Sequence, residues 1–351
     1  MCKVAKDVFF RSAYRNNENE REHWQREVLV DFLDIASKQG ATVAGNLTGK
    51  DMEDLKALAK KLENHTLDTG NDLVCDWIIE RFLEIEDNKD IKNLVSNIWV
   101  GLWDSSDTIN AGITNNPYYD ESYLIRFTSE FQILIRKIAE LFSTVVFLLD
   151  IPENDKIVCE VLMYLLSIEL HDICCEDTEI GVKNYIDMFP ESMHFCYEHI
   201  FRYSFLAGCA FVIFHEIGHR IEDDENLARY YKITPSSHIA DINERKIKGE
   251  YNADLISMKI IQKIFGQDEE TCWLGYAGIL ICFLSLSIRQ KDPTVTTDHP
   301  SIKNRYLCAK EFISDQYGAT AQHEIIRRVD AVAYLLAGIA DWSCDDWWRT
   351  N

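Results

Sequence analysis

One stretch of the chain carries no charge at all and limits how the rest can fold. Residues 273–288 read WLGYAGILICFLSLSI, sixteen residues that suit a helix of about four turns. A bilayer-spanning helix needs about 20 apolar residues, and glycines and serines dilute this stretch further. We therefore predict a helix buried in the core, which other elements must surround on every side; a membrane segment is the alternative.

Composition excludes several classes of protein. The chain has 351 residues, of which 47% are hydrophobic, so it can bury a substantial core and is not expected to be disordered. Its formal net charge of −22 repels phosphate backbones and anionic membrane surfaces. We expect no nucleic-acid or membrane partner, whereas a basic or neutral protein partner is compatible with this charge.

Cysteine usage and the first residues predict the compartment. The eleven cysteines are an odd number without a repeated spacing, which suits neither a disulfide framework nor a CxxC metal site. Reduced thiols in a cytoplasmic protein are the interpretation we favour. The charged start, MCKVAKD, lacks the apolar core of a signal peptide.

Two regions follow from the patterns along the chain. Residues 1–95 are strongly charged with helical periodicity, and we predict a helical accessory region without chemistry of its own. In the second region, 96–351, residues 96–113 indicate two short strands around a polar turn, and 127–149 indicate a long apolar helix. Residues 156–170 are a second buried element of either type. The expected fold class is α+β and predominantly helical.

The chemistry centres on residues 204–220, which read SFLAGCAFVIFHEIGHR. Residues four apart share one face of a helix, so His215 and His219 can bind one metal ion together. Glu216 is rotated by about 100° from His215, where it can reach a metal-bound water as a general base. The alternative is an amphipathic helix end with two solvent-facing histidines.

A catalytic zinc site needs a third protein ligand and one open position. Glu250 and Asp254 share a helix face at the start of GEYNADLISMKIIQKIF, which we predict opens another helix. We predict that Glu250 completes the zinc ligands and that Asp254 accepts the outer N–H of a ligand histidine. A solvated acidic face is the alternative in so acidic a chain.

Other third ligands fit less well. The longer pattern HExxHxxGxxH is absent, because Glu222 and Glu225 occupy the places of its glycine and last histidine. His238, in a loop with serine and proline, stays a competitor for the third position.

A third polar segment, DHPSIKNRY, occupies residues 298–306. Pro300 favours a turn or a helix start. We predict that His299, with Tyr306 or Arg305, stabilises the oxyanion that forms when a peptide bond is hydrolysed. An ordinary helix N-terminus is the alternative interpretation of this His-Pro pair.

HEIGH, EYNAD and DHPSIKNRY resemble, in order, the HExxH, ExxxD and HPxxxxR motifs of gluzincin peptidases. The chain is most similar to the Lit-type phage-exclusion peptidases, over about residues 205–306. The resemblance implies a minigluzincin-like catalytic domain with a small β-sheet beside the HExxH helix. It also implies zinc ligands His215, His219 and Glu250, base Glu216, supporting Asp254, and substrate or oxyanion groups His299 and Arg305.

The function implied by the resemblance is a cytoplasmic zinc endopeptidase that cleaves one specific protein. The family's known example cleaves elongation factor Tu in response to a phage capsid peptide, so this factor is the first candidate substrate and phage defence the first candidate role. The strands at 96–113 offer an edge for an extended substrate. The alternatives are a peptidase-like regulatory module with a zinc site and negligible turnover, and a membrane-embedded protease like HtpX. The oligomeric state stays open.

Overall fold

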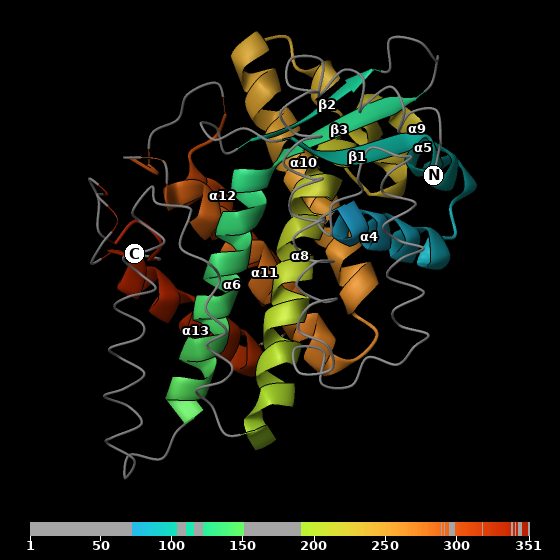
Figure 1. Ribbon diagram of the computed structural model, residues 1–351. Helices are drawn as coiled ribbons and strands as arrows, with labels where there is room; N and C mark the ends of the chain where they lie inside the picture. Colours follow the sequence, from blue (N-terminus) through green and yellow to red (C-terminus); the bar gives the residue numbers. More distant parts are fainter. Residues whose placement is uncertain are drawn as a thin grey trace, which may run out of the picture.

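A single long helix, α8 (Glu191–Asp223), runs through the middle of the protein, with a small sheet at one end of it (Figure 1). The computed structural model describes residues 72–103, 110–115, 122–150, 191–288, 290, 292–294, 299–317, 319–337, 340, 342 and 346–349. The other elements are α4 (Asp72–Ile85), α5 (Lys89–Ser96), β1 (Ile98–Trp103), β2 (Ala111–Asn115), β3 (Tyr123–Thr128), α6 (Ser129–Asp150), α9 (Glu225–Tyr230), the 3-10 helix η3 (Ser236–His238), α10 (Ile242–Phe265), α11 (Glu269–Ile288), α12 (Ile302–Tyr317) and α13 (Ala319–Ala337). The predicted class, α+β and predominantly helical, is confirmed.

The uncharged stretch forms most of α11, and the prediction of a buried helix is confirmed. Helices α6, α8, α10, α12 and α13 all contact it, so it has no face left for solvent along most of its length. By length and composition, residues 196–223 of α8 and 269–288 of α11 are apolar enough to cross a bilayer. However, 67% and 78% of their most apolar windows are buried inside the protein, as in core helices.

Helices α8 and α11 approach each other at the level of the backbone. A Cβ added to Gly278 would lie 2.5 Å from Cβ of Ala207 and 2.6 Å from the carbonyl oxygen of Ser204. Such separations are far inside van der Waals contact, so only glycine fits at this crossing. The small residues of the run before HExxH therefore serve to seat α11 against α8.

The sheet has the order β1-β3-β2, with β1 parallel to β3 and β2 antiparallel to it. Two strands begin within the predicted segment 96–113, although β2 continues to Asn115. They do not pair with each other, because β3 lies between them. Strand β3 is not predicted from the sequence, and its last two residues, 127 and 128, fall in the helix predicted over 127–149. That helix, α6, begins at Ser129.

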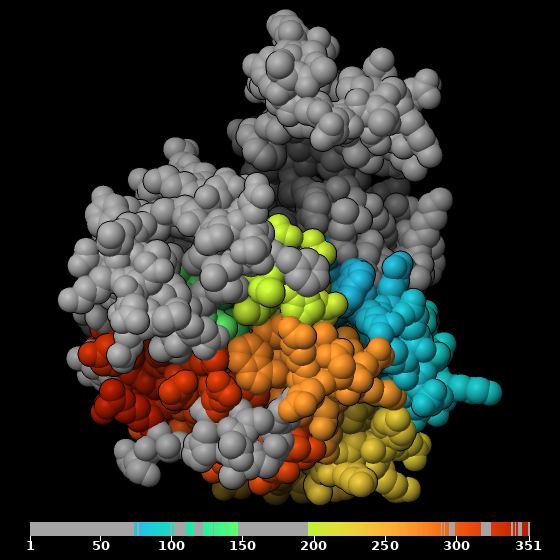
Figure 2. Space-filling model, turned by 90° about the horizontal axis from the view of Figure 1, so that it is seen from below, coloured from blue at the N-terminus to red at the C-terminus, as the bar shows by residue number. Residues whose placement is uncertain are grey.

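The described part of the predicted accessory region packs into the common core. Buried residues of α4 and α5 belong to the same hydrophobic cluster as those of α8 and α11. Arg81 of α4 also donates a hydrogen bond of 2.9 Å to Gln267 between α10 and α11, and Figure 2 shows α4 in blue beside the start of α11 in orange. Residues 1–71 and 156–170 lie outside the described residues, so the predicted boundary at residue 95 stays a prediction.

The cysteines that the structure describes are all free thiols. Cys75, Cys209 and Cys282 are buried, whereas Cys196 and Cys308 are exposed and Cys272 is intermediate. Buried free thiols of this kind behave as small hydrophobic residues.

Candidate metal centre

Two histidine side chains lie one turn apart on the same side of α8. The ring centroids of His215 and His219 are 4.8 Å apart. The helix continues beyond both, to Asp223, so regular helix geometry holds the two rings in place. His215 is buried, whereas 28% of the His219 side chain is exposed. Both histidines line a cavity.

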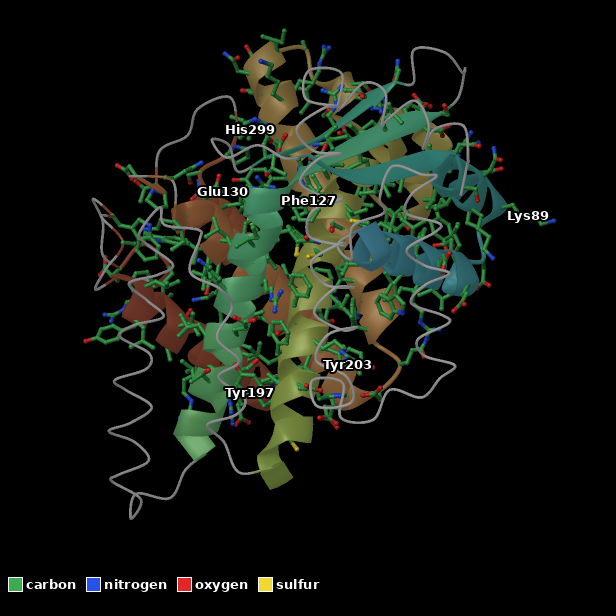
Figure 3. The ribbon with its side chains drawn as sticks, in the orientation of Figure 1. Lys89, Phe127, Glu130, Tyr197, Tyr203 and His299 are labelled. Carbon is green, nitrogen blue, oxygen red and sulfur yellow. The ribbon has the colours of Figure 1, made fainter. Side chains whose placement is uncertain are left out.

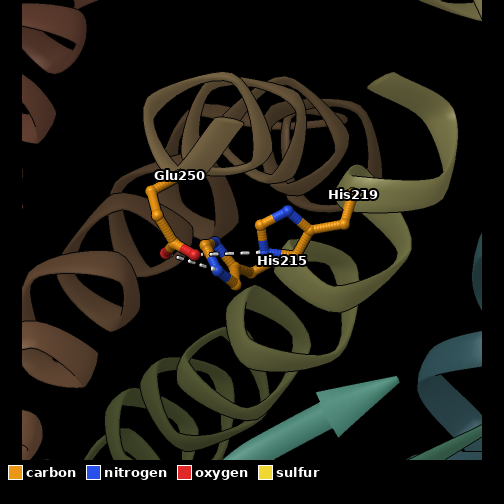
Figure 4. Close-up of side chains that lie close together, drawn as sticks. All are labelled: His215, His219 and Glu250. Carbon is orange, nitrogen blue, oxygen red and sulfur yellow. Dashed lines mark ion pairs between the residues drawn. The ribbon is translucent and has the colours of Figure 1, made fainter. Parts of the chain in front are cut away.

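Glu250 of α10 lies against both rings (Figure 4). Its Oε2 is 3.3 Å from Nε2 of His215, and its Oε1 is 3.5 Å from Nε2 of His219. One donor atom from each of the three residues lies within 4.8 Å of the others, so this buried group could hold a metal ion. Glu250 occupies the middle of α10, which begins at Ile242 and not near Glu250 as predicted.

A close approach between α8 and α10 brings Glu250 to the histidines. A Cβ added to Gly218 would lie 2.9 Å from Cα of Ala253 and 3.0 Å from its carbonyl oxygen. Gly218, the fourth residue of HEIGH and directly before His219, thus lets the two backbones touch. The obstructing atoms belong to the backbone and cannot rotate away.

Gly218→Ala is therefore expected to push α10 away from α8, lower the free energy of unfolding by about 1–3 kcal/mol and weaken metal binding. Chemical denaturation and metal titration measure the two effects. Gly112→Ala is the matched control, because a Cβ there meets nothing within 4 Å. If the two variants have the same free energy of unfolding and the same metal affinity, the close approach of α8 and α10 does not determine the geometry of the site.

A buried ion pair supports His215 from behind. Nδ1 of His215 lies 2.9 Å from Oδ1 of Asp254, so the ring donates its outer N–H and keeps Nε2 for a metal. The Arg305 guanidinium donates to both oxygens of Asp254, from Nε at 2.7 Å and from Nη2 at 2.6 Å. The structure thus brings Asp254 to its predicted place, with Arg305 bound behind it.

The pKa values of the group follow from burial and from these contacts. Burial by itself lowers the pKa of His215, but hydrogen bonds to Asp254 and Glu250 outweigh it and raise the pKa to about 9. Burial and the charge of His215 lower the pKa of His219 to about 4. Burial raises the pKa of Glu250, but hydrogen bonds from His215 and His299 outweigh it and hold that pKa below its usual range. The carboxylates of Asp254 and Glu250, on either side of His215, thus favour positive charge at this position.

Glu216, the predicted base, lies beside the metal ligands and is nearly buried, with 8% of the residue exposed. Burial raises the pKa of its carboxyl group, although the charge of His215 opposes the shift. The backbone N–H of Ile113 on β2 donates a hydrogen bond of 3.1 Å to Oε2 of Glu216. The strand and the role of Glu216 as a base are both predicted from the sequence, but this contact is not, because a backbone donor has no signature in the sequence.

His299 lies at the open side of the centre, between α12 and the sheet end of the protein (Figure 3). Its Nδ1 is 3.0 Å from Oε1 of Glu250, and 63% of its side chain is exposed. The hydrogen bond to Glu250 raises the pKa of its imidazole. Of the polar groups predicted from residues 298–306, it is the one that is exposed beside the ligands.

Two predicted residues lie elsewhere. Tyr306 is fully buried, donates to Asp330 at 3.0 Å and packs against the ring of Trp347. The prediction that it helps to stabilise an oxyanion is wrong, because α12 turns it towards the C-terminal tryptophans. His238 is exposed and pairs with Glu225 at 3.4 Å, apart from the metal group.

A cavity of about 700 Å³ is lined by His215, His219 and Glu250. Its polar part holds the two histidines, Glu216, Glu250, His299 and Arg305. Its apolar part comes from several helices, with lining residues Phe131, Phe211, Val212, Cys282, Leu286 and Ile302. Asn110 and Ala111 place the start of β2 at the rim. This apolar wall is not among the features predicted from the sequence, although Phe211 and Val212 lie one turn before His215.

Comparisons with family models, with curated proteins and with solved structures find no match to this chain.

Proposed function

We propose that this protein is a zinc-dependent endopeptidase whose metal is held by His215, His219 and Glu250. The observation that carries the proposal is the spacing of the ligand atoms. A tetrahedral zinc ion with bonds of about 2.0–2.1 Å has ligand atoms about 3.3–3.4 Å apart. Nε2 of His215 lies 3.3 Å from Oε2 of Glu250, and Nε2 of His219 lies 3.5 Å from Oε1 of the same carboxylate. These separations are of the size that zinc ligands have, and one donor atom from each residue lies within 4.8 Å of the others. Two imidazoles and one carboxylate are also a donor set that favours zinc.

Three protein ligands leave one coordination position open, which is the arrangement of catalytic and not structural zinc sites. The cavity of about 700 Å³ is lined by all three ligand residues, and its volume lies within the range of ligand-binding pockets. Zinc held by these residues would supply Lewis acidity and would lower the pKa of a bound water molecule. The residues around it must then orient substrate and move the proton.

Glu216 is the group suited to moving the proton. It accepts a proton from the attacking water and passes it to the leaving amine, which splits the peptide bond into a carboxylate and an amine. Burial raises the pKa of this carboxyl group, which favours the protonated form that the second step requires.

The remaining polar residues divide between substrate and support. The exposed imidazole of His299 is the donor available to the developing oxyanion. Arg305 was also predicted for this role, but its guanidinium is taken up by Asp254, and we propose that it holds the ligand His215 in place. The outward edge of β2 beside the cavity offers the backbone of Ala111 to an extended peptide.

The substrate proposal rests on the resemblance of three motifs to the Lit-type peptidases. We propose a specific cytoplasmic protein as the substrate, with elongation factor Tu as the first candidate and phage defence as the role. A membrane location is not needed, because both apolar helices bury most of their surface inside the protein.

Metal removal gives a direct prediction. The purified protein is expected to hold one zinc ion per chain. Chelation should lower its melting temperature, because the ion binds only the folded state. Elemental analysis and thermal unfolding, before and after zinc is returned, measure this. Absence of a stoichiometric metal ion would contradict the zinc proposal.

The decisive experiment compares new protein N-termini by mass spectrometry in cells that express wild type or Glu216→Gln. Cleavage sites seen only with wild type identify the substrate and its scissile bond. Glu225→Gln is the matched control, because Glu225 lies exposed at the start of α9 and pairs only with His238 among the described residues. A cellular effect that persists in Glu216→Gln, with no new N-termini, favours the metal-binding regulatory module instead.

A further inference from the structure

The general base receives a hydrogen bond from a strand that is distant in sequence. Oε2 of Glu216 accepts from the N–H of Ile113 at 3.1 Å, and the two residues are separated by 103 positions. The carboxylate is nearly buried, so water cannot easily replace this donor. The contact joins the sheet directly to the catalytic part of α8.

The pairing of β2 explains why this N–H is free to act. At the start of β2, the N–H of Thr128 donates to the carbonyl of Asn110 at 3.0 Å. In an antiparallel pair, alternate residues direct their backbone N–H and C=O groups to the partner strand. The backbone groups of residues 110, 112 and 114 are therefore directed towards β3. The backbone N–H of Ile113 is therefore directed away from β3, and no further strand of the described sheet pairs with it, because β2 is the edge strand.

We propose that Ile113 is a positioning residue whose backbone N–H fixes the Glu216 carboxylate for proton transfer; this inference rests on the proposed function. A backbone donor in a sheet cannot rotate, so it holds Oε2 in one place and leaves Oε1 for the attacking water. A misplacement of about 1 Å can cost about 100-fold in rate, so one fixed bond has a large effect. Because the Ile113 N–H is occupied by Glu216, it is not available to a substrate strand. An extended substrate therefore pairs with the backbone of Ala111.

Ile113→Pro tests the inference, because proline removes the N–H without removing a bond to β3. Gly112 precedes it and tolerates the restriction that proline imposes on its neighbour. We expect kcat on the identified substrate to fall about 10–100-fold, with KM and zinc affinity within about twofold of wild type. Asn115→Pro is the matched control. The backbone N–H of Asn115 is also directed away from β3, but it makes no hydrogen bond to Glu216 among the described residues.

A double-variant cycle separates positioning from a general loss of structure. In a Glu216→Asp background, whose shorter side chain draws the carboxylate back, Ile113→Pro should have little further effect. An equal loss of kcat in Asn115→Pro, a rise in KM with unchanged kcat, or full additivity in the cycle overturns the inference.

Hydrogen exchange tests the contact without activity. The Ile113 amide of wild type should be protected although it lies on a sheet edge, and Glu216→Ala should speed its exchange at least about tenfold. The amide of Gly112, which faces β3, is the internal control. Equal Ile113 exchange in wild type and Glu216→Ala overturns the inference. Absence of peptidase activity in zinc-loaded wild type instead overturns the proposed function, so the two failures are distinct.

Discussion

Glu216→Gln is expected to lower kcat about 10²–10⁴-fold while zinc stays bound, because an amide of the same shape cannot accept the proton of water. Neither the ligands nor the contacts of α8 with α10 change, so the fold and the metal content should stay as in wild type. The Ile113 N–H can still donate to the amide oxygen that replaces Oε2. Kinetics on the identified substrate and elemental analysis of the same sample measure the two quantities.

Glu225→Gln serves as the control for this variant as well, because it removes one carboxylate from the surface beside the same helix end. It should keep full activity. A Glu216→Gln protein that retains zinc and cleaves at the wild-type rate would show that another group moves the proton. Loss of zinc in Glu216→Gln would leave the base untested, so metal content must be measured first.

Arg305→Met is expected to give the largest loss of stability, about 3–5 kcal/mol, because it leaves a carboxylate buried without its cation. Asp254 is 3% exposed and accepts both hydrogen bonds from the guanidinium, which also lies over the ring of Phe283 at 5.3 Å. Burial raises the pKa of Asp254, but the charge of Arg305 outweighs it and holds the carboxyl group ionised. Denaturation in the presence of a chelator measures the change without a contribution from zinc.

The same variant should weaken zinc binding about 10–100-fold, since Asp254 then no longer holds His215 in a fixed orientation. Arg81→Met is the control for loss of an arginine, because its ion pair with Glu84 is exposed and should contribute below about 1 kcal/mol. Asp254→Leu combined with Arg305→Met should recover stability without recovering zinc affinity. If both quantities recover together, the pair has only a structural role.

The parts of the site that could be predicted are those encoded by the spacing of residues within one helix. HEIGH places two imidazoles on one face of a helix wherever the helix lies, and EYNAD does the same for Glu250 and Asp254. The uncharged run of α11 could only be a buried or membrane helix. The beginning of α10 was less predictable, because its first two turns, from Ile242 to Gly249, are polar and carry little hydrophobic periodicity.

The strand β3 and the directions of several side chains were not predictable. The strand β3 reads YLIRFT directly before an apolar helix, so the change of period between Thr128 and Ser129 is hidden in one continuous apolar run. Tyr306 and Arg305 are neighbours on α12, yet one faces Asp330 and the other Asp254. The direction of each side chain depends on which helices pack around α12.

By itself, the sequence determined that two histidines suited to hold a metal ion and the glutamate predicted as a base would share one helix, and that acidic groups on a later helix could join them. Tertiary structure alone decided that Gly218 lets α10 approach α8, that Arg305 supports Asp254, and that the backbone of Ile113 reaches Glu216. The physical reason is that helix periodicity is encoded within a few residues. The contact between distant backbones depends on how every surrounding element packs.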